Sequence, residues 1–267
     1  MMTENLPKDG IHGMVPRENM DTATSKLRDF YALKPGAPIV MKEFGFYCLD
    51  RWKREGHMSD ETNLQDLFGF DPYSQHGLFE LGWTEAAFKP VFEEKIIEDR
   101  GEHEVVQDWA GRHVLFFKGR RNGFMPEYLD HPVKDMKSWE ENCKWRLDPK
   151  SPERIKDMEE RMRKARNAAG TGKVITQHVI GGSMYLRSLI GPVDLMYKVY
   201  DEPELIHACM ETWFNLADAV TAMHQKHVSF DEFFIGEDIC FNHGPLISPD
   251  MIREFLFPYY QQLLKNI

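Results

Sequence analysis

Two adjacent carboxylates, Glu237 and Asp238, are the side chains of this sequence best placed for acid–base chemistry. They follow the short apolar run of residues 233–235 and one glycine, a pattern that predicts a buried β-strand. Enzymes built on α/β barrels carry their chemistry on the loops after the carboxyl ends of parallel strands. We therefore expect both carboxylates to act in catalysis, with helix capping as the alternative role.

Glu43 and His178 are the other candidate catalytic residues. Glu43 lies near the end of a strand predicted over residues 37–44, so it could face Glu237 across the mouth of a barrel. Paired carboxylates have pKa values that move apart, which suits proton transfer or binding of a cation. His178 lies within a β-rich run over residues 173–180, where a pocket role and a hydrogen-bonded core histidine are both open.

Arg187 and His243 are candidate substrate-binding residues. Arg187 follows a Gly-Gly pair on a short predicted helix and could hold an anionic group, or pair with an acid such as Asp194. His243 stands three residues after Cys240, beside the two carboxylates. A Cys-x-x-His spacing alone is common by chance, so we predict no metal ligand here.

The order of predicted elements is typical of an α/β protein. Strands are expected over residues 37–44, 78–81, 173–180 and 233–235, and helices over 21–33, 132–146, 151–170, 184–190 and 203–227, with a last helix capped by Ser248 and kinked at Pro258. Residues 92–117 alternate instead as an antiparallel meander in which Trp83 and Trp109 are expected to pack.

Strand, glycine-rich loop and helix in alternation predict a TIM (β/α)8 barrel. Only about four such strands can be counted, where a closed barrel needs eight. We therefore predict the first half or so of a barrel over residues 21–267, with a meander insertion at about residues 90–118, after an irregular N-terminal arm of residues 1–20.

Composition restricts the partners of the chain. A net charge of −10 over 267 residues argues against nucleic acid or an anionic membrane as partner. Apolar runs are too short for a membrane span, and residues 1–21 lack the apolar core of a signal peptide. Four distant cysteines indicate reduced thiols and a cytoplasmic location. The many Phe, Met and Trp residues suggest a pocket for a flat or hydrophobic ligand, or an ordinary core.

Four stretches in the last third of the chain carry a family resemblance. They are Gly-Gly-Ser-Met-Tyr-Leu-Arg-Ser-Leu-Ile-Gly at 181–191, Tyr-Asp-Glu-Pro-Glu-Leu at 200–205, Gly-Glu-Asp at 236–238, and 244–260 from Gly-Pro-Leu-Ile-Ser-Pro to Pro-Tyr-Tyr. In this order they resemble the uroporphyrinogen decarboxylase superfamily, which includes porphyrinogen decarboxylases and corrinoid methyltransferases. The resemblance implies one TIM barrel with a deep cleft at the strand C-termini, and adds Tyr185 to the candidate substrate-binding residues.

Departures from the decarboxylase pattern argue against that reaction. Porphyrinogen decarboxylases resembling this chain carry two arginines after their first strand, and these bind the carboxylates of the substrate. The matching run at 41–46 has Lys42 and Phe46 in their place. The nearest counterpart of the family's catalytic aspartate is Glu80, and Leu189 replaces its pocket tyrosine.

The resemblance therefore favours an enzyme of corrinoid-linked methyl transfer acting on a small-molecule substrate. Such relatives hold zinc through a His-x-Cys pair and a distant cysteine late in the barrel, beyond residue 267. Zinc and a corrinoid protein partner are thus possible for a methyltransferase, and no cofactor for a decarboxylase. Two other functions stay open. One is decarboxylation of uroporphyrinogen in porphyrin biosynthesis, and the other is a non-catalytic barrel that binds a tetrapyrrole or a small ligand. The chain could also form a homodimer, or be an inactive fragment whose open sheet edges self-associate.

Overall fold

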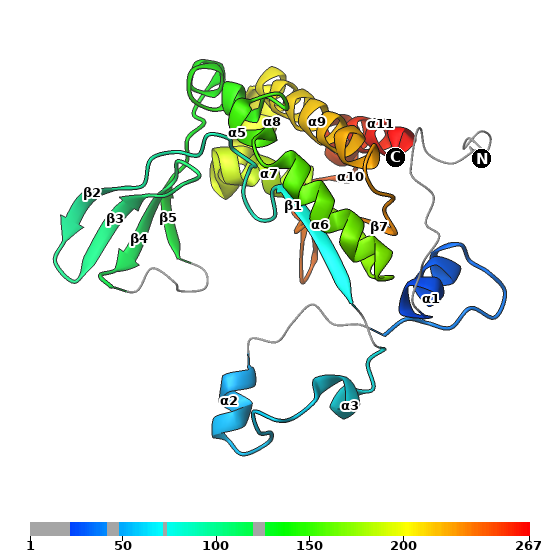
Figure 1. The fold of residues 1–267 in the computed structure, drawn as a ribbon. Coiled ribbons are helices and arrows are strands. Elements are labelled where there is room, and N and C mark those ends of the chain that lie inside the picture. Colours follow the sequence, from blue (N-terminus) through cyan, green and yellow to red (C-terminus); the bar gives the residue numbers. More distant parts are fainter. Residues whose placement is uncertain (1–21, 42–47, 72–73, 120–125) are drawn as a thin grey trace.

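The computed structural model describes residues 22–41, 48–71, 74–119 and 126–267, and is organised around a parallel sheet (Figure 1). Its three strands are β1 (Gln75–Leu81), β6 (Val174–Ile180) and β7 (Glu232–Gly236), in the order β1-β6-β7. All pairs are parallel, so the carboxyl ends of the strands meet at one edge. The α/β class is confirmed, whereas the described strands form an open sheet and no closed barrel.

The two faces of the parallel sheet have different surroundings. β6 is buried along its whole length, and its side chains alternate between the faces. Ile175 packs with Met162 and Ala165 of helix α6, so odd-numbered positions face the helices. Thr176 and His178 lie on the opposite face, which we call the open face. The open face carries polar and aromatic side chains.

Helices cover the other face of the sheet. The principal ones are α6 (Met158–Gly170), α7 (Gly182–Ile190), α8 (Pro192–Asp201), α9 (Pro203–Gln225) and α11 (Phe257–Asn266). Figure 1 shows these helices gathered above the sheet, with α2 (Leu49–Arg54) and α3 (Leu64–Phe68) apart from them below it.

Helix α9 forms the centre of the hydrophobic core. Its expected apolar stripe is buried, namely Ile206, Cys209, Met210, Trp213, Leu216 and Val220. Trp213 also donates its indole N–H to the carbonyl of Ile180 at 2.7 Å, which joins α9 to the carboxyl end of β6. His224, near the end of this helix, is fully buried. It lies there because its Nδ1 is 2.7 Å from Oε1 of Gln177, a polar residue on the helix face of β6.

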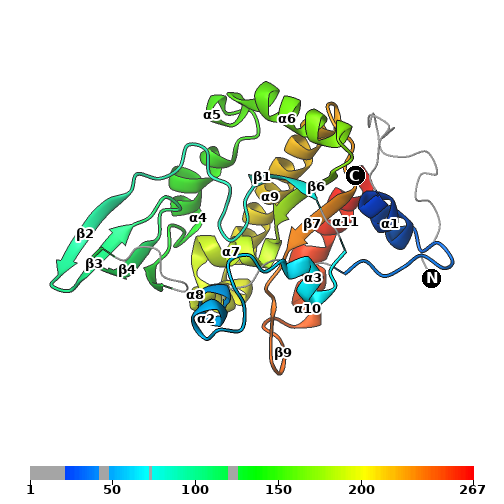
Figure 2. The same ribbon diagram turned by 60° about the horizontal axis from the view of Figure 1, so that its bottom comes forward.

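The antiparallel meander is confirmed as a four-stranded sheet. It consists of β2 (Lys95–Arg100), β3 (His103–Gln107), β4 (His113–Phe117) and β5 (Glu127–Asp130), in sequential order. It thus runs to residue 130, past the expected end near 118, because Glu127–Asp130 pairs with β4. Figures 1 and 2 both show this meander sheet projecting away from the helices and the parallel strands.

The N-terminal part differs from expectation at its predicted strand. Helix α1 (Thr22–Tyr31) forms as predicted, and Arg28 binds Asp231 at 2.5 Å. The predicted strand over 37–44 is not formed at residues 37–41, which have no regular structure, and its remainder lies outside the described residues. Asn63 caps α3, and its side chain accepts hydrogen bonds from the amides of residues 65 and 66.

Two predicted helices contain π-helical turns. The helix expected over 132–146 divides into α4 (Met136–Ser138), the π turn η1 (Trp139–Cys143) and the 3₁₀ turn η2 (Lys144–Leu147). The last helix begins at α10 (Pro249–Met251), capped by Ser248 as expected, and passes through the π turn η3 (Ile252–Leu256) into α11. Pro258 has no amide hydrogen to donate back into this turn, which accounts for the irregularity.

Short elements complete the described structure. They are α5 (Pro152–Ile155) and a two-stranded hairpin of β8 (Cys240–Phe241) and β9 (Gly244–Pro245). Among the described helices, none combines the length and the apolar character that crossing a bilayer would require.

Candidate functional site

Four aromatic rings meet on the open face near the carboxyl ends of the parallel strands. His178 stacks on Phe79 with ring centroids 4.1 Å apart and planes 15° from parallel. Trp83 and Phe234 each lie 5.4 Å from the His178 ring, and Trp83 stacks on Phe234 at 5.6 Å. We call these four residues the aromatic platform. Phe79 and Trp83 are 54% and 42% exposed, so a ligand can reach their faces, whereas His178 is only 4% exposed.

A chain of hydrogen bonds leads from helix α1 to His178. The hydroxyl groups of Tyr31 and Thr176 donate to the two carboxylate oxygens of Glu232, at 2.7 and 3.0 Å. Gln75 donates its amide N–H to Thr176 at 2.6 Å, and the same nitrogen lies 3.4 Å from Nε2 of His178. Burial and the Glu232 carboxylate raise the pKa of Tyr31 far above its ordinary value, so its hydroxyl stays protonated.

This chain favours one tautomer of His178. Thr176 has one hydroxyl proton, which goes to Glu232, so it must accept from the NH₂ group of Gln75. The amide group of Gln75 nearest to His178 is therefore a donor, and Nε2 accepts. A neutral ring that accepts at Nε2 is protonated at Nδ1.

Glu237 is bound at the N-terminus of helix α7. Its carboxylate accepts from the amides of Ser183 and Met184 at 2.9 and 3.3 Å, and from the hydroxyl of Tyr260. The same hydroxyl accepts from the amide of Gly182 at 2.6 Å. A carboxylate is stabilised there by free amides and by the positive end of the helix dipole. Glu237 thus has the capping role that the sequence left open.

Asp238 and Arg187 form an ion pair at the same edge of the sheet. Nη1 of Arg187 lies 3.0 Å from Oδ2 of Asp238, so the expected pairing with Asp194 is replaced by this one. Their side chains are 34% and 60% exposed, which leaves the pair accessible to a substrate. Exposed pairs of this kind contribute little to stability, so their exchange for a ligand group costs little.

Glu80 lies on the opposite face of the sheet. It is 2.7 Å from Nε of Arg161 on α6 and packs beneath the helices. The alternation of β1 explains this position, because Phe79 points to the open face and its neighbours in sequence point away. The structure therefore does not bring Glu80 together with His178.

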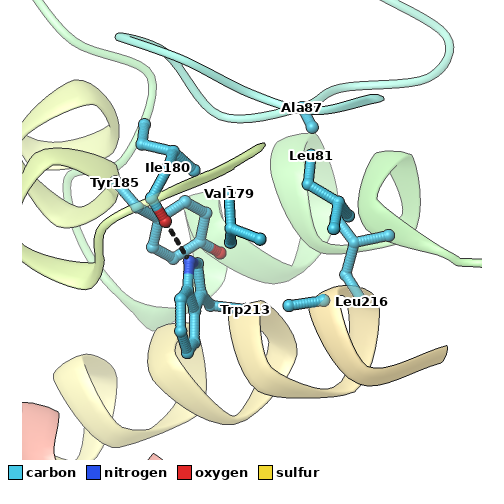
Figure 3. Close-up of a pocket in the computed structure, with 8 residues that line it drawn as sticks. Leu81, Ala87, Val179, Ile180, Tyr185, Trp213 and Leu216 are labelled. Carbon is cyan, nitrogen blue, oxygen red and sulfur yellow. Dashed lines mark hydrogen bonds between the residues drawn. The ribbon is translucent and has the colours of Figure 1, made fainter. Parts of the chain in front are cut away.

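Tyr185 is a core residue. Its ring is 1% exposed and lines a small apolar cavity beside Trp213, Val179 and Leu81 (Figure 3). Its hydroxyl has no hydrogen-bond partner among the described residues, and burial raises its pKa well above the ordinary value. Tyr185 is thus separated from the platform and from the Arg187–Asp238 pair.

The remaining predicted site residues do not join this group. His243 and Cys240 are exposed on the β8–β9 hairpin, where His243 contacts the ring of Phe241. In the described ranges, no three or more His, Cys, Asp or Glu side chains are grouped as a metal site would require. Lys42 and Glu43 lie outside the described residues, so the expected approach of Glu43 to Glu237 is not described.

Several residues of the site did not stand out in the sequence. Trp83 was expected to pack in the meander, yet it belongs to the platform. Gln75 and Glu232 open their strands and gave no motif, although an acid at the start of an apolar run is a signal that could have been followed. Tyr260 appeared only inside a stretch that carries the family resemblance.

Comparison of the chain with protein-family models, with curated proteins and with solved structures finds no match.

Proposed function

We propose that this chain is a cytoplasmic, uroporphyrinogen decarboxylase-like enzyme that binds a small, flat or apolar substrate. The aromatic platform is the observation that carries the proposal. Phe79 and Trp83 keep exposed ring faces at the carboxyl edge of a parallel sheet, where α/β proteins bind ligands. Exposed rings held in fixed mutual contact favour stacking of a flat molecule.

The side chains around the platform suggest separate roles. His178 lies in the platform with one tautomer favoured by Gln75, which suits it to hold or move one proton near a stacked ligand. Arg187 can exchange Asp238 for an anionic group of the substrate, which leaves Asp238 as an acceptor of protons. Glu237 acts as a positioning residue, because its hydrogen bonds fix α7 and thereby Arg187.

The balance of charge supports methyl transfer over decarboxylation of uroporphyrinogen. The described carboxylates at this edge are Glu237 and Asp238, against the single guanidinium of Arg187. A substrate with many carboxylates would be repelled by such a site, whereas a neutral substrate would not. Zinc and a corrinoid would supply the methyl-transfer chemistry, and a metal site for them is not formed by the described residues. Glu43 and Lys42 stay predictions.

A non-catalytic ligand-binding role is the second candidate. The carboxylate of Glu237, the expected catalytic acid, already accepts hydrogen bonds from an amide of α7 and from the hydroxyl of Tyr260. This favours the binding role. A binding protein would keep the platform and need no free acid.

Binding of methylcobalamin to the full-length protein, followed by its visible spectrum, tests the proposal. Methyl transfer to a simple thiol would give a thioether, cob(I)alamin and one proton. We expect Trp83→Ala to weaken binding about tenfold, because it removes an exposed face of the platform. Trp145→Ala, a matched exposed tryptophan on η2, should have no effect.

Elemental analysis and a uroporphyrinogen assay complete the experiment. Zinc at one per chain with thiol methylation supports the methyltransferase. Release of carbon dioxide from uroporphyrinogen would instead show that the protein is a decarboxylase. Ligand binding that depends on Trp83, without turnover of either substrate, would leave the binding role. Equal binding by the wild type and Trp83→Ala would reject the platform as the site.

A further inference from the structure

The meander sheet contains a hollow that is separate from the aromatic platform. Its floor is formed by Val106 and Val114, which pair across β3 and β4 and are both buried. Trp109, in the turn before β4, and Tyr128 of β5 line it with ring surfaces that are 38% and 40% exposed. The hollow measures about 250 Å³ and is open to solvent. This lies just below the size range of sites for drug-sized molecules, so the hollow suits a small ligand.

A buried guanidinium lies in the wall of this hollow. Arg112 directs Nε to Asp108 at 2.8 Å, and Nη2 to Asp108 and Glu85 at 2.7 and 3.1 Å. Its guanidinium also covers the ring of Tyr128 at 4.5 Å. Among the described residues, no partner takes its Nη1, so the two N–H groups of that nitrogen remain for a ligand. The side chain is rigidly held before any ligand arrives, which lowers the entropy cost of binding.

The charges around the hollow select against ions. Asp108 and Glu85 together outweigh the positive charge of Arg112, and Glu94 at the rim adds another carboxylate. An anion would meet this excess of carboxylates. A cation would gain little from Asp108, because its two oxygens already accept from the amide of Ala110 and from the amide, Nε and Nη2 of Arg112. A neutral molecule with an acceptor for Nη1 avoids both costs.

We propose that this hollow is a binding site for a neutral, flat aromatic molecule that carries a carbonyl group. The rings of Trp109 and Tyr128 supply stacking surfaces, the valine floor excludes water, and Arg112 donates to the carbonyl. The site is independent of the function proposed for the platform, since Figures 1 and 2 show the meander sheet projecting away from the parallel strands.

Three ligands of one shape test the proposal by equilibrium dialysis with the full chain. The probes are 2-naphthamide, which is neutral, 2-naphthoate, which is an anion, and 2-naphthyltrimethylammonium, which is a cation. We expect 2-naphthamide to bind at least fivefold more tightly than either charged probe. Trp109→Ala should weaken its binding about fivefold through loss of stacking. Tyr128→Leu keeps an apolar side chain over Arg112 and should weaken binding to a similar extent. It replaces Trp109→Ala as the test if that variant does not fold.

A matched control locates the site. Trp145→Ala removes an exposed tryptophan elsewhere and should leave the affinity unchanged. Loss of 2-naphthamide binding in Trp83→Ala but not in Trp109→Ala would assign the ligand to the platform and overturn the proposal. Equal affinities for the three probes, or no binding of 2-naphthamide at low millimolar concentration, would also overturn it.

Discussion

The hydroxyl of Tyr260 donates a hydrogen bond to the carboxylate of Glu237, and this contact ties helix α11 to the carboxyl end of β7. The same hydroxyl accepts from the amide of Gly182. One oxygen atom therefore joins three elements of the fold. Burial and the adjacent carboxylate raise the pKa of Tyr260 far above its ordinary value, so its hydroxyl stays protonated and can donate to Glu237.

Tyr260→Phe should destabilise the protein by about 1–3 kcal/mol, because it removes one of the two donors to Oε1 of Glu237 and leaves the amide of Gly182 without its partner. The free energy of unfolding in urea measures the loss. Tyr197→Phe, which removes a hydroxyl from an exposed ring, is the matched control and should change stability by less than about 0.5 kcal/mol. Equal effects of the two changes would contradict the structural role of this hydroxyl.

Arg187→Ala and Asp238→Ala should leave stability nearly unchanged, since their ion pair is accessible to solvent. Ligand binding should respond differently. If Arg187 holds an anionic substrate group, its loss raises KM, whereas loss of Asp238 frees Arg187 and lowers KM or leaves it unchanged. Parallel urea unfolding and steady-state kinetics separate the two effects. A loss of stability above about 2 kcal/mol in either variant would show that the pair is structural.

Arg154→Lys should be strongly destabilising, by about 2–4 kcal/mol, although it conserves charge. Arg154 is 2% exposed and donates to the carbonyls of Glu80, Ala87, Arg146 and Asp148. An ammonium group cannot reach four carbonyls that diverge in this way. Burial lowers the pKa of Arg154 to about 10, in agreement with the desolvation of its charge. Arg163→Lys, on the exposed surface of α6, is the control, and a similar effect of both would refute this prediction.

The pH dependence of stability should report His224. Burial first, and then Arg161, lowers its pKa from 6.5 to about 3, so the folded state binds fewer protons than the unfolded state between these values. Stability is therefore full above about pH 6.5 and falls as the pH drops towards 3, by at most about 1.4 kcal/mol per pH unit from this group. His224→Asn, whose amide can still donate to Gln177, should flatten this slope. An unchanged slope between pH 4 and 6.5 would contradict the assignment. His131, with a pKa lowered to about 4 by burial, contributes in the same sense and stays in both proteins.

The elements of the fold could be predicted where one local signal decides them. The β6 run of branched residues and the amphipathic period of α9 each determine an element without reference to the rest of the chain. The π turns could not be predicted, because each spans only five residues, and the one-residue shift that it introduces is short compared with the window over which hydrophobic spacing is recognised. The path of residues 37–41 also escaped prediction, since an apolar run forms a strand only if a neighbouring strand accepts it.

The site was predictable in position but not in orientation. Glu237, Asp238 and Arg187 do meet at the carboxyl edge of the parallel strands, as their placement after strands and a glycine loop indicated. Which side chain faces the ligand depends on the phase of each element. Phe79 and Glu80 are neighbours on one strand, so their side chains point to opposite faces of the sheet. Phe79 lies on the open face and Glu80 lies beneath the helices. Tyr185 and Arg187 are separated likewise, by the phase of α7, into the core and the accessible edge.

The π turn η3 determines how α11 is rotated about its own axis. A π turn holds one residue more than an α-helical turn, and each residue of an α-helix advances the chain by about 100° around the axis. If the same residues instead continued as a regular α-helix, everything after this turn would be rotated by about 100°. The side chain of Tyr260 would then sweep away from Glu237, and a different face of α11 would be offered to α9. The single extra residue thus works as an angular offset between two helical segments, and it determines which tyrosine reaches the carboxylate.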